Sequence, residues 1–185
     1  MYQIYHTQGY VLGSIPKGED SKVLILYTRE LGLVYAHAQG IRKLSSKLRF
    51  TLCDYAKANI DLVRGKDVWR VTTATSISTF SLVIGTEESI KITERIFKLL
   101  RRLVVGEEPN EEIYLAMARL FDLFSVPNNT KEDYRHIELI TVARILMALG
   151  YLHKGRLEGD EVLSNIAKEH ELIRDINKAL AETHL

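Results

Sequence analysis

The residues best suited to chemistry in this sequence are the cations of one short segment, GIRKLSSKLRF at residues 40–50. It contains Arg42, Lys43, Lys47 and Arg49, and it has no acidic residue. Lys and Arg that neutralise backbone phosphates release counterions, and this release supplies much of the affinity of proteins for nucleic acids. A solvated loop has a similar composition. Charge by itself therefore leaves both interpretations open.

Other cations and aromatic residues strengthen the nucleic-acid interpretation. The turn RGK at 64–66 adds a second basic loop, and Lys17 and Lys22 lie at the first barrel loop, at 14–20. An aromatic side chain that stacks on an unpaired base contributes ~1–3 kcal/mol, although core packing is the alternative for each one and is the favoured interpretation for Trp69. The candidate DNA-binding residues are Lys17, Lys22, Tyr35, Arg42, Lys43, Lys47, Arg49, Phe50, Arg64 and Lys66.

The sequence offers little for catalysis. None of its 6 histidines forms an HxH or HExxH arrangement, and there is no GxxxxGK[ST] or GxGxxG phosphate loop. The acidic residues at 107–112 precede an expected helix, where they complement the helix dipole rather than bind a metal. The single cysteine, Cys53, excludes a multi-cysteine zinc site. We therefore expect no enzyme activity, no metal and no cofactor.

Charge is distributed unevenly along the chain. The net charge is +1, but residues 1–80 contain 11 Lys+Arg and 6 Asp+Glu, which gives +5, and the remainder gives −4. A basic, aromatic-rich segment joined to an acidic one suggests that the first segment binds an anionic polymer. We also expect no secretory signal, no membrane span and a cytoplasmic, nucleoid-associated protein.

The elements that would position the basic segment are strands. Stretches rich in Tyr, Ile, Val and Thr are found at residues 2–13, 22–28, 33–39, 51–63 and 68–80. Turn signals at 14–20, 29–32 and 64–67 separate several of them. Five strands without a convincing amphipathic helix predict a small antiparallel barrel of the OB type, with the basic segment between the third and fourth strands.

The hydrophobic period changes to a helical one beyond residue 85. Thr86 is expected to cap one helix, Pro109-Asn110-Glu111-Glu112 to begin a second, and Thr130 with Asp133 to cap a third that runs to Leu149. A loop at 153–160 and two shorter helices within 161–183 are expected to follow. The predicted fold class is α+β, with an OB-fold domain at 1–82 and an all-α domain at 83–185.

The order of these motifs resembles the RecO family of bacterial DNA-repair recombination mediators. The matching pieces are GYVLGS at 9–14, the stretch 18–50, which contains LYTRELG, and LVRGKDVW at 62–69. A weaker match, ARILMALGYL at 143–152, lies where the family's helical domain ends its main helix. One departure is Gln39, where the family commonly has lysine. Another is the absence of the four-cysteine zinc site that many members carry after the Gly-Tyr, so a shortened, zinc-free helical domain is implied.

The resemblance implies an OB domain that binds single- and double-stranded DNA and anneals complementary strands. It also implies two protein partners, a RecR-like recombination protein and the acidic C-terminal tail of single-stranded DNA-binding protein. Arg144 on the third expected helix is a candidate contact for that tail, with a solvated surface arginine as the alternative. Two other functions remain open from the residues themselves, a protein–protein adaptor whose cations stay solvated and an RNA-binding OB factor.

Overall fold

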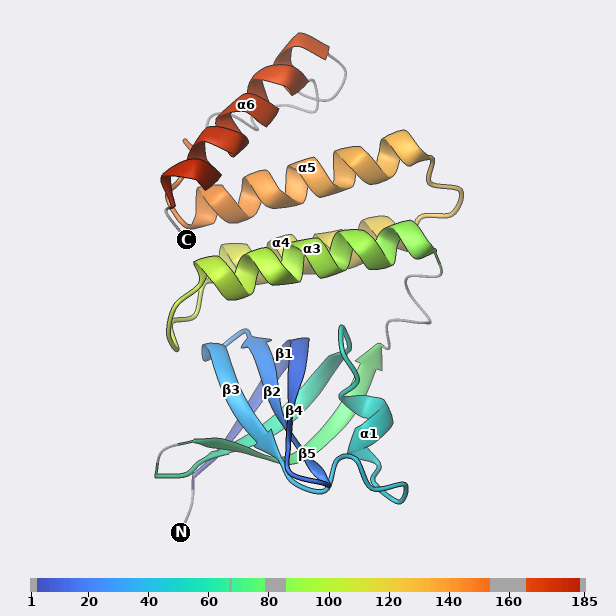
Figure 1. The fold of residues 1–185 in the computed structure, drawn as a ribbon, viewed down its shortest axis with the longest axis vertical. Helices are drawn as coiled ribbons and strands as arrows, with labels where there is room; N and C mark the ends of the chain where they lie inside the picture. Colours follow the sequence, from blue (N-terminus) through green and yellow to red (C-terminus); the bar gives the residue numbers. More distant parts are fainter. Residues whose placement is uncertain (1–2, 67, 79–85, 154–165, 184–185) are drawn as a thin grey trace. The chain divides into compact units, whose positions relative to one another are not determined.

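The structure, a computed structural model, describes residues 3–66, 68–78, 86–153 and 166–183 (Figure 1). Its described residues form two compact units. One unit combines the β-barrel with Phe97–Pro109, and the other combines Thr86–Ile96 with the chain from Asn110 onward. The candidate nucleic-acid-binding residues at 17–66 all belong to the first unit.

The strands of the first unit close into a barrel. They are β1 (Ile4–Lys17), β2 (Ser21–Thr28), β3 (Gly32–Ala38), β4 (Lys57–Arg64) and β5 (Trp69–Ser78). The order around the barrel is β1-β2-β3-β5-β4, with β4 pairing back onto β1. The prediction of a five-stranded barrel of the OB type is confirmed.

One detail of that prediction was wrong, because the barrel is mixed rather than wholly antiparallel. Four pairings are antiparallel, but β3 and β5 run parallel, with Ala36 opposite Trp69 and His37 opposite Arg70. The reason is topological. β4 and β5 form an antiparallel pair that joins β1 on one side, so β5 reaches β3 in the same direction.

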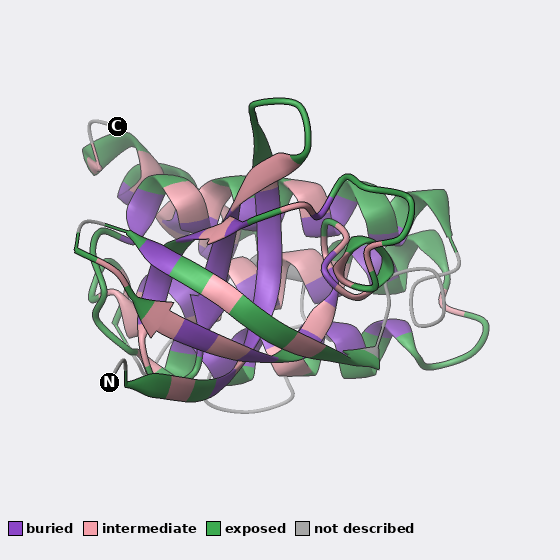
Figure 2. Ribbon diagram, turned by 90° about the horizontal axis from the view of Figure 1, so that it is seen from below, coloured by how far each residue is buried: buried purple, intermediate pink, exposed green. Residues whose placement is uncertain are grey.

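β-branched and apolar residues form these strands, and alternate side chains along each strand point into one core. Leu24, Leu26, Val34, Ala36 and Ile60 are 0–1% exposed and point inward, as period-two patterning requires. Figure 2 shows buried and exposed residues alternating along some strands of the barrel, whereas other strands are buried over much of their length. Trp69 is 4% exposed and its ring lies edge-on to Tyr5 at 5.1 Å, which confirms core packing for this tryptophan.

Two strand boundaries differ from those predicted. β1 continues to Lys17, beyond Gly9 and a register shift between Val11 and Gly13, because each half of this bent strand pairs with a different neighbour. Residues 51–56 are not a strand, since helix α1 (Leu48–Thr51) and a turn with Tyr55 at φ 70° precede β4. Local propensity did not reveal either feature because tertiary pairing decides both.

The remaining described helices follow the predicted order. They are α3 (Glu87–Leu103), α4 (Glu111–Phe124), α5 (Lys131–Ala148) and α6 (Ile166–Glu182). The two predicted caps are confirmed: the Thr86 side chain accepts a backbone N–H group at 3.3 Å, and Thr130 and Asp133 form a capping box. The predicted start of α4 is also confirmed, and the Asn110 side chain caps it by accepting a backbone N–H group at 3.1 Å.

The C-terminal region differs from the expected pair of short helices. A single helix, α6, of 17 residues occupies the described part of 161–183. Most of the expected loop at 153–160 lies outside the described residues, as do residues 161–165. None of the helices in the described part of the chain is long and apolar enough to cross a membrane.

Candidate nucleic-acid interface

The basic segment lies between β3 and β4, as predicted, and folds into consecutive turns. Gly40 has a φ of +65°, and backbone hydrogen bonds run from Lys43 N to Gly40 O at 3.1 Å and from Ser46 N to Lys43 O at 3.0 Å. Buried Ile41 and half-buried Leu48 anchor the segment to the barrel core. The cations between these anchors remain exposed.

The turn between β1 and β2 holds the beginning of this segment in place. Arg42 donates its backbone N–H to Asp20 O at 2.9 Å and its guanidinium to Gly18 O at 3.2 Å. Lys43 Nζ lies 3.5 Å from the Asp20 carboxylate. These contacts organise the loop before any ligand binds, which lowers the entropy cost of binding. They also reduce the charge that Lys43 presents.

A pocket of about 470 Å³ lies beside the basic segment. Its lining residues are Lys22, Ile41, Arg42, Arg49, Leu52, Cys53 and Asp54. Lys22 Nζ donates to Ser14 Oγ at 3.1 Å, and Ser14 Oγ donates to Asp54 at 2.8 Å, so the carboxylate takes part in an internal network. Three cations against one carboxylate give this pocket, which we call the loop pocket, an excess of positive charge.

Cys53 lines the loop pocket as a packing residue. Its side chain is half-buried against the barrel core. Burial raises the pKa of the Cys53 thiol above its ordinary value. Since the thiolate is the reactive form, the thiol stays protonated and unreactive near neutral pH.

Two candidate aromatic residues lie on the surface. Phe50 is 70% exposed and Tyr35 is 49% exposed, so neither side chain is committed to the core. The Arg49 guanidinium lies 5.9 Å from the Phe50 ring centroid, which places a cation beside an aromatic face next to the loop pocket. Leu44, 87% exposed, adds an apolar side chain to the same loop.

A second cationic group lies on the outer face of the barrel. Tyr35 and His37 share one face of β3 because they are two residues apart. Arg70 is opposite His37 on β5, and Lys17 is close enough to influence the imidazole. Burial, then Lys17 and Arg70, lower the pKa of His37. The sequence did not indicate that Arg70 lies beside His37, because their pairing depends on the parallel β3–β5 contact, which no local pattern reveals.

The closeness of His37 to Lys17 and Arg70 leads us to expect that DNA binding depends on pH. Because the pKa of His37 is lowered in the folded protein, its imidazole is neutral near pH 7 and resists protonation beside two cations. A phosphate bound there offsets that repulsion and favours the protonated form. When the pH is lowered from about 7.5 to 5.5, we expect the affinity for single-stranded DNA to rise in the wild type. The rise should be a few-fold larger than in His37→Gln. Fluorescence anisotropy across this range tests it, and identical profiles would contradict it.

The RGK turn is only partly available to a ligand. Arg64 lies 3.1 Å from Glu107, and its guanidinium is 5.3 Å from the Trp69 ring centroid. Trp69 Nε1 donates to the same Glu107 carboxylate at 2.8 Å. These contacts hold Arg64 against the barrel although its side chain is 62% exposed, and Lys66 is also exposed at the turn. Both residues remain predictions as DNA contacts.

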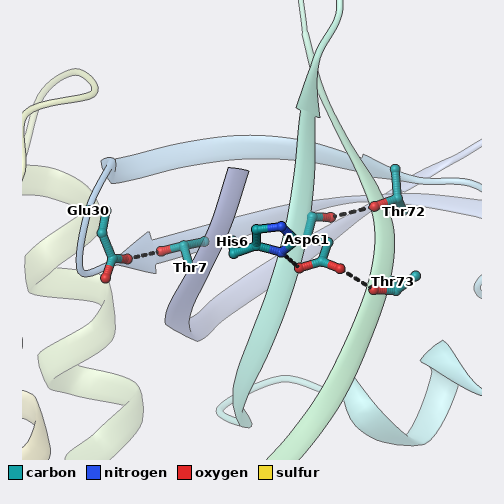
Figure 3. A network of polar contacts seen from close by, with 6 residues as sticks. All are labelled: His6, Thr7, Glu30, Asp61, Thr72 and Thr73. Carbon is teal, nitrogen blue, oxygen red and sulfur yellow. Dashed lines mark hydrogen bonds and ion pairs between the residues drawn. The ribbon is translucent and has the colours of Figure 1, made fainter. Parts of the chain in front are cut away.

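A separate polar network crosses β1, β4 and β5 on the barrel surface (Figure 3). His6 Nδ1 lies 2.6 Å from Asp61 Oδ1, and Thr73 Oγ1 donates to Asp61 Oδ2 at 2.7 Å. These hydrogen bonds from Thr73 and then His6 lower the pKa of Asp61. The Thr73 hydroxyl donates to the carboxylate rather than to the imidazole, so this is a cross-strand ladder and not a nucleophile–base pair.

Arg144 lies in the helical unit. Its side chain is half-buried on α5, where burial and then the nearby Arg119 of α4 lower the pKa of its guanidinium. Two like charges in a partly desolvated position favour an anionic ligand. The sequence did not indicate that Arg119 lies near Arg144, because only the packing of α4 against α5 brings the two side chains together.

Comparisons with known proteins agree with the motif order. Residues 1–80 match the family model "Recombination protein O N terminal". Two curated relatives carry the name DNA repair protein RecO. One, from Pelotomaculum thermopropionicum, is 27% identical over 66% of this chain and 48% of its own length. The other, from Rubrobacter xylanophilus, is 27% identical over 84% of this chain and 60% of its own length.

A third relative with the same name, from Heliobacterium modesticaldum, is 32% identical over 55% of this chain and 37% of its own length. The chain therefore spans about half the length of the curated relatives that it matches. The family model covers the whole described barrel, and the longer matches continue into the helices. The barrel at residues 1–80 thus matches the N-terminal domain of the RecO family, and the chain as a whole is similar to DNA repair proteins of that name.

Proposed function

We propose that this chain is a non-enzymatic recombination mediator that binds single- and double-stranded DNA and promotes strand annealing and recombinase loading. The observation that carries the proposal is the loop pocket, where Lys22, Arg42 and Arg49 converge beside exposed Phe50. Phosphates bind the cations, and an unpaired base stacks on the aromatic ring. The β2–β3 face and neighbouring loops are also where OB barrels bind oligonucleotides.

The helical unit is proposed to bind protein partners. Arg119 and Arg144 form a half-buried pair of like charges, which suits the acidic C-terminal tail of single-stranded DNA-binding protein. A RecR-like recombination protein is the second proposed partner. The proposed assignment of domains is DNA binding to residues 1–82 and partner binding to 83–185, in a cytoplasmic protein associated with the nucleoid.

A strand-annealing assay tests the proposed activity. The variant carries alanine at Arg42, Lys43, Lys47 and Arg49. We expect it to anneal complementary oligonucleotides at least about tenfold more slowly than the wild type, because it lacks the cations that neutralise phosphates on both strands. A matched control carries alanine at Lys91, Lys131, Arg174 and Lys178, which are exposed on the helices and change the net charge equally.

Annealing by the control should stay close to that of the wild type. Equal slowing of both variants would mean that net charge, rather than the loop, governs annealing. Competition between RNA and DNA of equal sequence measures the relative affinity of the protein for the two nucleic acids. Stronger binding of RNA than of DNA would replace the proposal by an RNA-binding function.

A further inference from the structure

Three ligand-type side chains converge between α5 and α6. Glu132 and His136 are four residues apart on α5, so they share one face of the helix, and Glu169 reaches them from α6. His136 Nε2 lies 3.7 Å from Glu132 Oε1 and 3.7 Å from Glu169 Oε2. All three ligand atoms lie within 4.8 Å of one another.

The burial of this cluster distinguishes it from an ordinary surface group of acids. Glu169 is 6% exposed, and a carboxylate so deeply buried is costly unless its charge is compensated. His136 Nε2 and Glu169 Oε1 are buried and lack a hydrogen-bond partner. Arg135 Nη2 approaches Glu169 Oε1 to 3.1 Å as an ion pair, without hydrogen-bonding alignment.

The distances suit coordination better than direct hydrogen bonding. A separation of 3.7 Å is too long for a good hydrogen bond between His136 and either carboxylate. Two ligand atoms that each bind one metal ion at about 2.1 Å in a tetrahedral arrangement lie roughly 3.4 Å apart. Small rotations of these side chains would therefore bring their donor atoms around one ion.

We propose that Glu132, His136 and Glu169 bind a divalent transition-metal ion, and that this ion fastens α6 to α5. One imidazole and two carboxylates form a donor set that matches zinc, with water completing the coordination on the exposed side of Glu132. Glu169 Oε2 coordinates the ion, while Arg135 beside Oε1 orients the carboxylate. The competing explanation is a metal-independent ion pair between protonated His136 and the two carboxylates.

Zinc titration of the full chain after chelator treatment tests the proposal. We expect one zinc ion per chain by calorimetry and a melting temperature that rises by a few degrees with zinc. Affinity should fall more than about tenfold in His136→Ala and in Glu169→Gln. Glu132→Gln should weaken binding without endangering the fold, since this side chain is 66% exposed. His170→Ala, the exposed neighbour on α6, is the matched control.

Cobalt supplies a second readout that does not depend on stability. Cobalt bound by imidazole and carboxylates gives visible d–d absorption, which should be weaker in Glu132→Gln at the same cobalt concentration and unchanged in both His170→Ala and Cys53→Ser. Far-UV circular dichroism verifies the fold of each variant. Absence of zinc binding by the wild type, or equal binding by the wild type and Glu132→Gln, would overturn the proposal and leave the ion pair as the explanation.

Discussion

Replacing Arg42 and Arg49 together by glutamine is expected to reduce the affinity for single-stranded DNA by roughly 25-fold at 0.1 M salt. Each neutralised phosphate contributes about 0.7 to the logarithm of the affinity at this salt concentration, because the slope against log[salt] is ≈ −0.7 per contact. Both side chains line the loop pocket and remain exposed. The salt slope should fall by about 1.4 at the same time.

The matched comparison is Lys43→Gln with Lys47→Gln, which removes equal charge from the same loop. We expect a smaller loss of affinity, since neither lysine lines the loop pocket and Lys43 is already paired with Asp20. Fluorescence anisotropy with a labelled oligonucleotide at several salt concentrations measures both quantities. An equal or larger loss in the lysine pair would contradict the assignment of the pocket as the main phosphate site.

Replacing Gly32 by alanine is expected to lower the free energy of unfolding by about 2–5 kcal/mol. Gly32 has a φ of +67°, where an L-residue costs roughly 1–2 kcal/mol. A Cβ at this position would also lie 2.3 Å from Glu108 O, so the backbone there must shift, which costs a further ~1–3 kcal/mol. Urea unfolding measures the change.

Gly18→Ala is the natural control for this experiment. Gly18 has the same φ of +67°, but a Cβ there meets no atom within 4 Å. It should therefore show only the conformational cost of roughly 1–2 kcal/mol. The difference between the two variants isolates the contact between the β2–β3 turn and Glu108. Equal destabilisation would mean that this contact relaxes without cost.

The sequence predicted those parts of the structure that depend on neighbouring residues. The β-branched and apolar residues of β2, with the polar turn before β3, located both strands, and Thr130 with Asp133 indicated a capping box, because these signals lie within a few positions. The place of the basic segment between β3 and β4 followed from the order of strands. The exposure of Tyr35 and Phe50 could not be predicted from the sequence, since an aromatic residue in a strand or loop can equally well pack in a core.

Long-range contacts account for what the sequence could not predict. Arg64 is balanced by Glu107, 43 residues later, so its charge could not be assigned from the RGK turn. Arg70 joins His37 only because β3 and β5 meet in parallel. His136 and Glu169 come together only because α6 packs against α5. A search for short motifs such as HxH or HExxH cannot reveal a cluster of this kind.

The parallel contact between β3 and β5 links the folding of the barrel to its binding surface. β3 ends at Ala38 and β5 begins at Trp69, so the intervening chain is a long connection that must close before the barrel exists. Such non-local closure is the slow part of folding, and its entropy depends on the length of the connection. Since that connection contains the basic loop, lengthening or shortening the loop alters the assembly of the barrel and the reach of its cations together. A change in the length of this one loop therefore affects two properties of the barrel, its folding and its binding surface.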